Sequence, residues 1–150
     1  RLPVVGARGL SLTVDRPANG PGRAMLLGEQ HVAVAPYRDE LRMSGWFELG
    51  TWSLDPQPSR IERIEALARS RLDLDADLTN RQSWAGLRPM TPDGVPVIGP
   101  SRRWSNVTIA TGHAMTGLSM GLGTGRLVAQ LVDGEPTDID VGRFSIGRFA

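Results

Sequence analysis

The alternation of hydrophobic and polar positions divides the first fifty residues into short extended segments. Residues 2–14 are predicted to be strand, and within them residues 8–14 alternate polar and apolar positions with the period of two that is typical of a half-buried strand. Further strand-like segments follow at 24–28, 31–36 and 41–49, and the polar residues 37–40 connect the last two. Because tight connections join antiparallel neighbours, the pattern predicts an antiparallel meander.

The period changes after residues 55–58, whose sequence DPQP breaks the strand pattern. Ser59 stands where a helix N-cap belongs and Glu62 follows three residues later, which predicts a capping box. We therefore expect a helix over residues 59–72. Its apolar positions at helical spacing are Ile61, Ile64, Leu67, Ala68 and Leu72.

The last third of the chain has a different pattern. Residues 84–99 contain three prolines around a Pro-Asp-Gly turn, which predicts a loop. A strand over 106–111, a glycine-containing turn and a helix over 116–132 follow, and Gly134 is placed to end that helix. The whole pattern predicts an α+β fold: an antiparallel sheet with flanking helices, followed by a strand and a helix.

Composition narrows the classes of function. The 150 residues carry a formal net charge of +1, which gives no indication of nucleic-acid binding. The chain has no cysteine, so disulfides and thiolate metal sites are excluded. It has no apolar run long enough to span a membrane and no segment of signal-peptide form. The first residue is Arg1 rather than Met, so we expect a truncated or processed chain.

The strand–turn–helix at 106–132 is one place where chemistry is expected. A turn of this kind exposes several backbone N–H groups at the start of the helix, and the helix dipole adds partial positive charge. Such a helix start suits an anionic or electron-rich ligand group. The glycines within LGTG (122–125) do not form a dinucleotide fingerprint, because they lie inside the helix and not in the turn after the strand.

Three glycines of this helix recur every fourth residue and so share one face: Gly117, Gly121 and Gly125. Each costs about 1 kcal/mol of helix stability relative to alanine. A compensating close approach is therefore expected, either of another backbone or of a flat ligand.

Arg88 is framed by apolar residues and followed by Pro89. A guanidinium held in this way suits a substrate carboxylate, and it equally suits a structural ion pair. In the strand 41–49, Trp46 and Glu48 share one face and Phe47 points to the other. One of these faces could line a pocket, and core packing is the other interpretation.

Taken together and in this order, two segments are recognisable. GLRPMTPDGVPVIG (86–99) and NVTIATGHAMTGLSMGLGTGRLVAQLV (106–132) resemble the C-terminal segment of the D-amino-acid oxidase-like flavoproteins, and are most similar to the D-amino-acid dehydrogenases. ARGLSLTV (7–14) and LRMSGWFELG (41–50) also fit the substrate domain of that family.

The resemblance implies FAD as cofactor and an amino acid as substrate. It implies that residues 1–83 are the later part of a substrate-binding domain and that residues 84–150 complete the FAD-binding domain. The Gly-rich region that holds the ADP part of FAD would precede Arg1. The implied reaction is hydride transfer from an amine-bearing carbon to the flavin, giving an imine and then an oxo acid, with no catalytic acid or base supplied by this chain.

The resemblance also assigns roles to residues. Arg88 matches the arginine that binds the substrate carboxylate, and Trp46 and Glu48 are weaker candidates for substrate contact. The turn before the second helix would lie against the pyrimidine end of the flavin, where His113 shapes the turn and is not expected to act as a base. The cofactor-binding set is Gly86, Gly112, His113, Ala114, Met115, Thr116, Gly117 and Leu118.

The implied location is the cytoplasm, with peripheral association at the inner membrane and a membrane quinone chain as electron acceptor. Two alternatives stay open at this point. One is a non-catalytic carboxylate-binding or assembly module that keeps the fold. The other is an oxidase of the glycine or sarcosine type.

Overall fold

The computed structural model describes residues 2–77 and 79–150, so expectations for Arg1 and Leu78 lie outside it. The chain forms two compact units. The first, which we call the sheet unit, is Ala7–Leu87. The second, the hairpin unit, combines the residues up to Gly6 with Arg88–Ala150.

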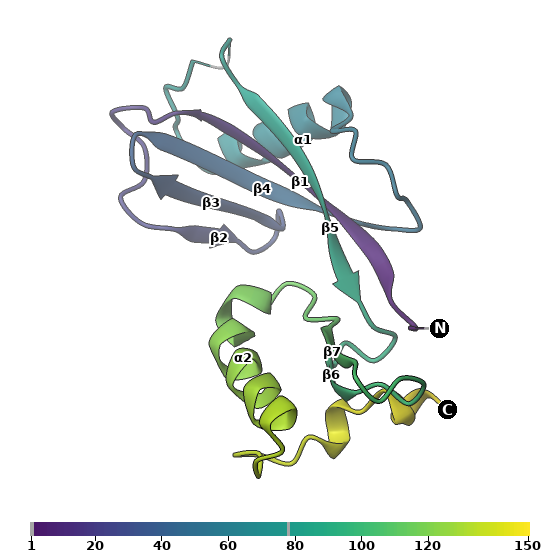
Figure 1. Cartoon of the computed structure of the whole chain (residues 1–150). Coiled ribbons are helices and arrows are strands. Elements are labelled where there is room, and N and C mark those ends of the chain that lie inside the picture. The colour runs from purple at the N-terminus through teal and green to yellow at the C-terminus, as the bar shows by residue number, and fades with distance from the viewer. Residues whose placement is uncertain (1, 78) are drawn as a thin grey trace. The chain divides into compact units, whose positions relative to one another are not determined.

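A five-stranded sheet with the order β2-β3-β4-β1-β5 dominates the sheet unit (Figure 1). Its strands are β1 (Val5–Asp15), β2 (Met25–Leu27), β3 (Val32–Tyr37), β4 (Glu40–Leu49) and β5 (Gln82–Met90). The pairs β2–β3, β3–β4 and β1–β4 are antiparallel. The predicted meander is therefore confirmed for β2, β3 and β4, whereas β1 pairs with β4 and not with β2, the next strand in sequence.

A β-bulge interrupts the pairing of β1 with β4. The register shifts between Arg8, which pairs with Glu48, and Leu10, which pairs with Gly45. Trp46 lies at this irregularity with φ of 70°. Bulges of this kind re-aim side chains.

Helix α1 (Pro58–Arg69) covers one face of the sheet (Figure 1). The expected helix is present, but the capping box is wrong: Gln57 is the N-cap and makes no side-chain cap, while Ser59 lies inside the first turn. Pro58 explains the difference, because its fixed φ and missing N–H suit the first helical position. The core of this unit consists of Leu10, Leu12, Val14, Val32, Val34, Leu41, Met43, Ile61, Ile64, Ala68, Leu74 and Ala85.

The loop expected over 84–99 is largely wrong, because β5 occupies residues up to Met90 and β6 (Val97–Pro100) begins soon after. Strand β5 lies at the edge of the sheet, next to β1. An edge strand tolerates proline because one side of its backbone needs no ladder hydrogen bond. Pro89 therefore does not prevent strand formation.

In the hairpin unit, β6 pairs antiparallel with β7 (Thr108–Thr111), and α2 (Gly117–Asp133) packs against both strands. The predicted strand and helix are confirmed. Gly134 closes α2 in the left-handed conformation with φ of 72°, as expected. Two short 3₁₀ turns, η1 (Gly142–Phe144) and η2 (Ile146–Phe149), form the tail.

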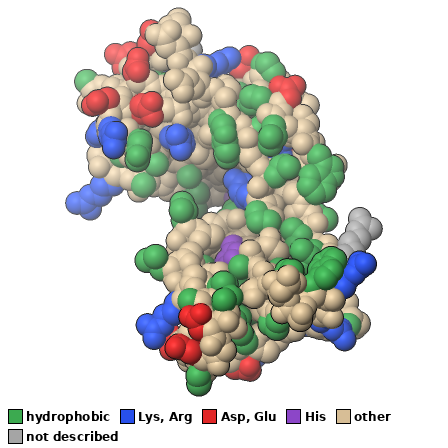
Figure 2. Space-filling model, viewed as in Figure 1, with side chains coloured by type: hydrophobic (Ala, Val, Ile, Leu, Met, Phe, Trp, Pro, Cys, Tyr) green, Lys and Arg blue, Asp and Glu red, His purple; other side chains and the backbone are tan. Residues whose placement is uncertain are grey.

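The fold class is α+β, as the hydrophobic pattern predicts. Acidic and basic side chains are interspersed on the face drawn in Figure 2, in keeping with the net charge of +1. Among the described residues, no helix is long and apolar enough to cross a membrane.

Candidate functional site: the turn before helix α2

The turn between β7 and α2 has an unusual backbone. Gly112 and Ala114 both have positive φ, 82° and 50°. Thr116 stabilises the turn, because its backbone N–H and its hydroxyl each donate to the carbonyl of His113 at 2.9 Å. The left-handed conformation costs free energy at a residue such as alanine. These hydrogen bonds hold the turn in this conformation.

The same turn is held against the end of β5. The N–H of Ala114 donates to the carbonyl of Pro89 at 3.1 Å. A Cβ placed on Gly112 would lie 2.6 Å from Cγ2 of Thr91, which only a residue without a side chain avoids. Arg88 directly precedes Pro89 in this strand, so the hairpin unit joins two of the segments that the sequence singles out.

The start of α2 is not capped by the described part of the chain. Thr116 is the N-cap but its side chain makes no cap hydrogen bond, and the first turn has no acidic residue. Within residues 2–77 and 79–150, no acceptor pairs with the N–H groups of Gly117, Leu118 and Ser119. Met115 is 70% exposed and Leu118 100% exposed beside them.

These features fit the pyrimidine end of a flavin. A flat ring with electron-rich oxygen and nitrogen atoms at its edge needs N–H donors and apolar cover. The amides at the start of α2, together with the positive end of the helix dipole, would supply the N–H donors, and Met115 and Leu118 would supply the apolar cover.

His113 is tied to its own helix. Its Nε2 lies 2.9 Å from the hydroxyl of Thr124, two turns along from the start of α2. This contact fixes the ring and so helps to fix the turn. The contact is in keeping with a shaping role, and the role of His113 toward a cofactor stays a prediction.

The glycine face of α2 is open. A Cβ built on Gly121 or on Gly125 would meet nothing within 4 Å, and one on Gly117 would meet only Cβ of His113 at 3.5 Å. Leu122 on the same helix is 92% exposed. No part of the described chain therefore makes the close approach that these glycines predict.

Arg88 is partly buried, and this burial lowers the pKa of its guanidinium. Arginine starts from so high a value that it stays a cation at neutral pH. A partly desolvated, permanently charged guanidinium forms strong, charge-assisted hydrogen bonds with a carboxylate. Its assignment as the carboxylate anchor stays a prediction.

Trp46 and Glu48 lie in the sheet unit and share one neighbour, Arg60. The guanidinium of Arg60 lies over the indole of Trp46, 5.3 Å from the ring centroid, and also pairs with Glu48. Glu48 accepts a second pair from the buried Arg8, whose Nη2 lies 2.6 Å from Oε2. Both residues therefore have structural roles, and their contact with substrate stays a prediction.

The pKa of Glu48 is lowered below its ordinary value, first by the hydrogen bond from Arg8 and then by Arg60. Arg8 also donates to the carbonyls of Ser53 and Asp55 at 3.3 and 3.1 Å. The network thereby connects β1 and β4 to the segment that leads into α1.

Gly86, in β5, has a packing reason of its own. A Cβ at this position would lie 2.1 Å from Cη2 of Trp84, so the indole occupies the space of the missing side chain. Gly86 belongs to the sheet unit, whereas residues 112–118 belong to the hairpin unit. A role for Gly86 in cofactor binding stays a prediction.

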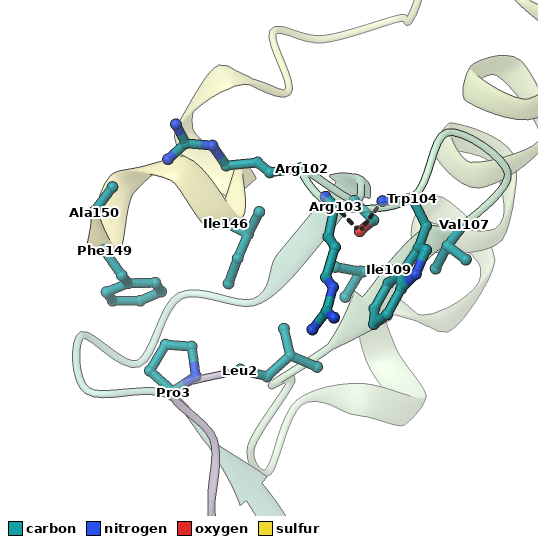
Figure 3. Close-up of a pocket in the computed structure, with 11 residues that line it drawn as sticks. Leu2, Pro3, Arg102, Arg103, Trp104, Val107, Ile109, Ile146, Phe149 and Ala150 are labelled. Atoms are coloured by element: carbon teal, nitrogen blue, oxygen red, sulfur yellow. Dashed lines mark hydrogen bonds between the residues drawn. The ribbon is translucent and has the colours of Figure 1, made fainter.

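A pocket with a volume of about 670 Å³ lies elsewhere in the hairpin unit. Figure 3 shows Arg103 reaching along it beside Trp104, and its guanidinium lies 4.8 Å from the indole centroid. None of the predicted cofactor or substrate residues lines it. The pocket is lined by Leu2, Pro3, Ser101, Arg102, Arg103, Trp104, Val107, Ile109, Ile146, Phe149 and Ala150.

Two residues near the predicted site were not found from the sequence: Asp93 and Arg148. They form an ion pair with Nε–Oδ2 of 2.8 Å although 55 residues separate them. The turn at 92–94 is visible in the sequence, but the tail has no period that would assign Arg148 a partner.

Comparison with known proteins establishes the class. Residues 1–131 match the FAD-dependent oxidoreductase family. The chain belongs to this family.

Among curated relatives, the chain is 35% identical to the D-amino acid dehydrogenase of Rhizorhabdus wittichii and 37% identical to that of Paramagnetospirillum magneticum. Each alignment covers 99% of this chain and 36% of the relative. The chain thus spans little more than a third of the length of these relatives. The resemblance noted in the sequence is confirmed.

Solved structures support the fold. Glycine oxidase from Geobacillus kaustophilus superimposes with a TM-score of 0.78 at 24% identity, over 97% of this chain and 40% of that one. L-proline dehydrogenase from P. horikoshii superimposes with a TM-score of 0.79 at 19% identity, over 99% of this chain and 41% of that one.

Proposed function

We propose that the chain is the C-terminal part of an FAD-dependent dehydrogenase that oxidises D-amino acids or closely related amines. The observation that carries this proposal is the identity of 35–37% to D-amino acid dehydrogenases along 99% of the chain. The hydrogen bond that joins the turn before α2 to the strand carrying Arg88 supports it, because substrate and cofactor must meet in such an enzyme.

In the proposed reaction the flavin supplies the acceptor for a hydride. Arg88 binds the substrate carboxylate and so orients the Cα–H bond, and catalysis then comes largely from positioning. The Cα–H bond breaks with its electron pair, the amine nitrogen loses a proton to solvent, and a C=N bond forms. Water adds to the imine and releases ammonia and the oxo acid.

The amides at the start of α2 take the electrostatic role. They would face the part of a bound flavin where negative charge gathers on reduction, and preorganised dipoles of this kind need no rearrangement during the reaction. No side chain of residues 112–118 is required as an acid or base. Trp46 and Glu48 are further proposed contacts of the substrate, and Gly86 is a further proposed contact of the cofactor.

We further propose a cytoplasmic enzyme that associates peripherally with the inner membrane and passes its electrons to a membrane quinone chain. The choice of electron acceptor is supported by the relatives, which are named dehydrogenases, since a dehydrogenase uses an acceptor other than oxygen.

The test uses the whole enzyme purified with its flavin. Anaerobic addition of D-amino acids is expected to bleach the flavin absorbance, and the L-enantiomers are expected to leave it unchanged. Arg88→Ala is expected to weaken binding of the amino acid by several kcal/mol, because it removes a charge-assisted pair. The flavin content is expected to stay the same. Bleaching by glycine or sarcosine alone would identify the oxidase-type alternative, and no bleaching by any amine would favour the non-catalytic module.

Reoxidation separates the two acceptors. The reduced enzyme is expected to react quickly with a soluble quinone analogue and slowly with oxygen. Fast oxygen consumption with peroxide formation would contradict the quinone proposal.

A further inference from the structure

The tail of the chain is bound to the turn that follows β5 by the guanidinium of Arg148, whose N–H groups all donate hydrogen bonds. Arg148 has five N–H groups, the full set that arginine carries. Nε and Nη2 donate to the two carboxylate oxygens of Asp93 at 2.8 and 3.2 Å. Nη2 also donates to the carbonyl of Val95 at 2.6 Å, and Nη1 donates to the carbonyls of Phe144 and Ser145 at 3.0 and 3.1 Å.

The turn on the other side of this contact is itself highly ordered. The hydroxyl of Thr91 donates to the carbonyl of Val95 at 2.8 Å, so that carbonyl accepts from both Thr91 and Arg148. Asp93 accepts from the N–H of Val95 at 3.1 Å. The bond from Arg148 is the first of several that lower the pKa of Asp93 well below its ordinary value, so the pair is fully ionised at neutral pH.

The turn leads directly to the candidate site. The methyl group of Thr91 fills the space above Gly112, and Pro89 accepts the N–H of Ala114. Residues 88–95 are therefore held at one end by the turn before α2 and at the other by Arg148. Arg88 lies at the start of this fixed segment.

We propose that Arg148, paired with Asp93, is a positioning residue that sets the place of Arg88 relative to the turn 112–116. The inference rests on the proposed function, because it gives Arg88 the carboxylate. Arg148 contacts neither substrate nor cofactor in this proposal and acts through the segment 89–95. The family match ends at residue 131, so Arg148 lies outside the matched residues.

Lysine does not replace this arginine. An ammonium has three donors on a flexible stem and does not bridge a carboxylate and three carbonyls in a fixed plane. Arg148→Lys keeps the charge and loses the geometry, whereas Asp93→Asn keeps the shape and loses the charge. We expect both variants to loosen the segment.

A matched control lies in the same unit. Arg126 pairs with Asp138, and both side chains are more exposed than those of Arg148 and Asp93. Arg126→Ala removes an ion pair without touching residues 88–95 or 112–116. It is expected to behave as wild type in each measurement below.

The first measurement needs no activity. Hydrogen exchange on the purified holoenzyme is expected to show faster exchange of the Ala114 amide in Arg148→Ala, by about tenfold or more, since its partner Pro89 is released. Wild-type protection of Ala114 in Arg148→Ala would overturn the proposal. Hydrogen exchange does not depend on turnover. A wild-type enzyme that oxidises no amine would therefore refute the proposed function, and the exchange measurement would still test the effect of Arg148.

The second measurement asks whether Arg148 acts through Arg88. For a D-amino acid, Arg148→Lys is expected to raise KM about tenfold, in line with a small misplacement of an anchoring group, with little change in kcat. For the corresponding D-amino acid amide, which has no carboxylate, KM is expected to be unchanged. Arg148→Lys in an Arg88→Ala background is expected to add nothing. Equal losses for acid and amide, or additive losses in the double variant, would overturn the proposal.

Discussion

The two units differ in how much of their apolar surface they cover themselves. The sheet unit packs α1 against a five-stranded sheet and buries a contiguous core between them. In the hairpin unit, Leu127 is the one buried residue that α2 has among the described residues, and Leu118 and Leu122 are almost completely exposed. The first unit has what a small domain needs to fold by itself, whereas α2 has an apolar face that requires a further partner.

On the proposed function, that partner is the rest of the whole enzyme. The chain covers 36% of their length, so most of a relative lies outside the region compared. We expect the exposed face of α2 to be covered in the whole enzyme. In the 150-residue chain, substitutions on this face are expected to have little effect on the free energy of unfolding.

The largest expected difference in stability is between two leucine-to-alanine substitutions, one in each unit. Leu12→Ala removes a side chain that is 0% exposed and is expected to destabilise the chain by about 2–5 kcal/mol, through lost burial and the cavity it leaves. Leu118→Ala removes one that is 100% exposed and is expected to change stability by less than about 0.5 kcal/mol. Denaturant unfolding of the 150-residue chain measures both, and similar losses would mean that α2 is covered after all.

The sequence predicted these two regions with unequal success, for a physical reason. Strand alternation in β3 and β4 and the helical spacing in α1 are local, and each was found. Strand β5 was missed because Pro89 and the turn after it resemble a loop, while the pairing with β1 that makes β5 a strand joins residues far apart in sequence. The N-cap was misplaced because Pro58 begins the helix two residues before the Ser59–Glu62 pattern would: the N-cap is Gln57 and not Ser59.

The candidate site divides in the same way. The turn 112–118 was visible because strand, turn and helix follow one another directly. Asp93 and Arg148 were not visible, because no local period relates residues that lie 55 positions apart. The bulge at Trp46 depends on the register between β1 and β4, which the sequence of one strand does not contain.

An intermediate effect is expected from pH at Glu48, in the sheet unit. The pKa of Glu48 is lowered in the folded state, so its carboxylate stabilises the fold above the ordinary value of 4.5 and this contribution disappears as pH falls through the folded pKa. At pH 7 the wild-type chain is expected to have a higher Tm than Glu48→Gln. The difference should shrink below about pH 4.5, and a gap that persisted at the lowest pH would show that the charge of Glu48 is not its cause.

Glycine substitutions in α2 are expected to affect the stability of the 150-residue chain and of the whole enzyme differently. Gly121→Ala meets nothing within 4 Å, so it is expected to stabilise the chain by about 1 kcal/mol through better helix propensity. In the whole enzyme the same change is expected to destabilise, because a partner approaches that face. Gly134→Ala is the control: its φ of 72° makes alanine unfavourable in both forms. Stabilisation by Gly121→Ala in both would contradict the close approach.

The smallest expected effect on stability is at Gly86, where it tests whether the sheet unit contributes to the cofactor site. A Cβ there meets the outer edge of Trp84, but that indole is 64% exposed and free to turn, so Gly86→Ala is expected to cost the chain less than about 1 kcal/mol. In the whole enzyme we expect loss of flavin, measured by absorbance after gel filtration. The double variant Gly86→Ala with Trp84→Ala identifies the cause, since it removes the contact with the indole. If flavin is still lost, the methyl group itself obstructs the cofactor; if flavin returns, Gly86 serves only to accommodate Trp84 and its place in the cofactor site is wrong.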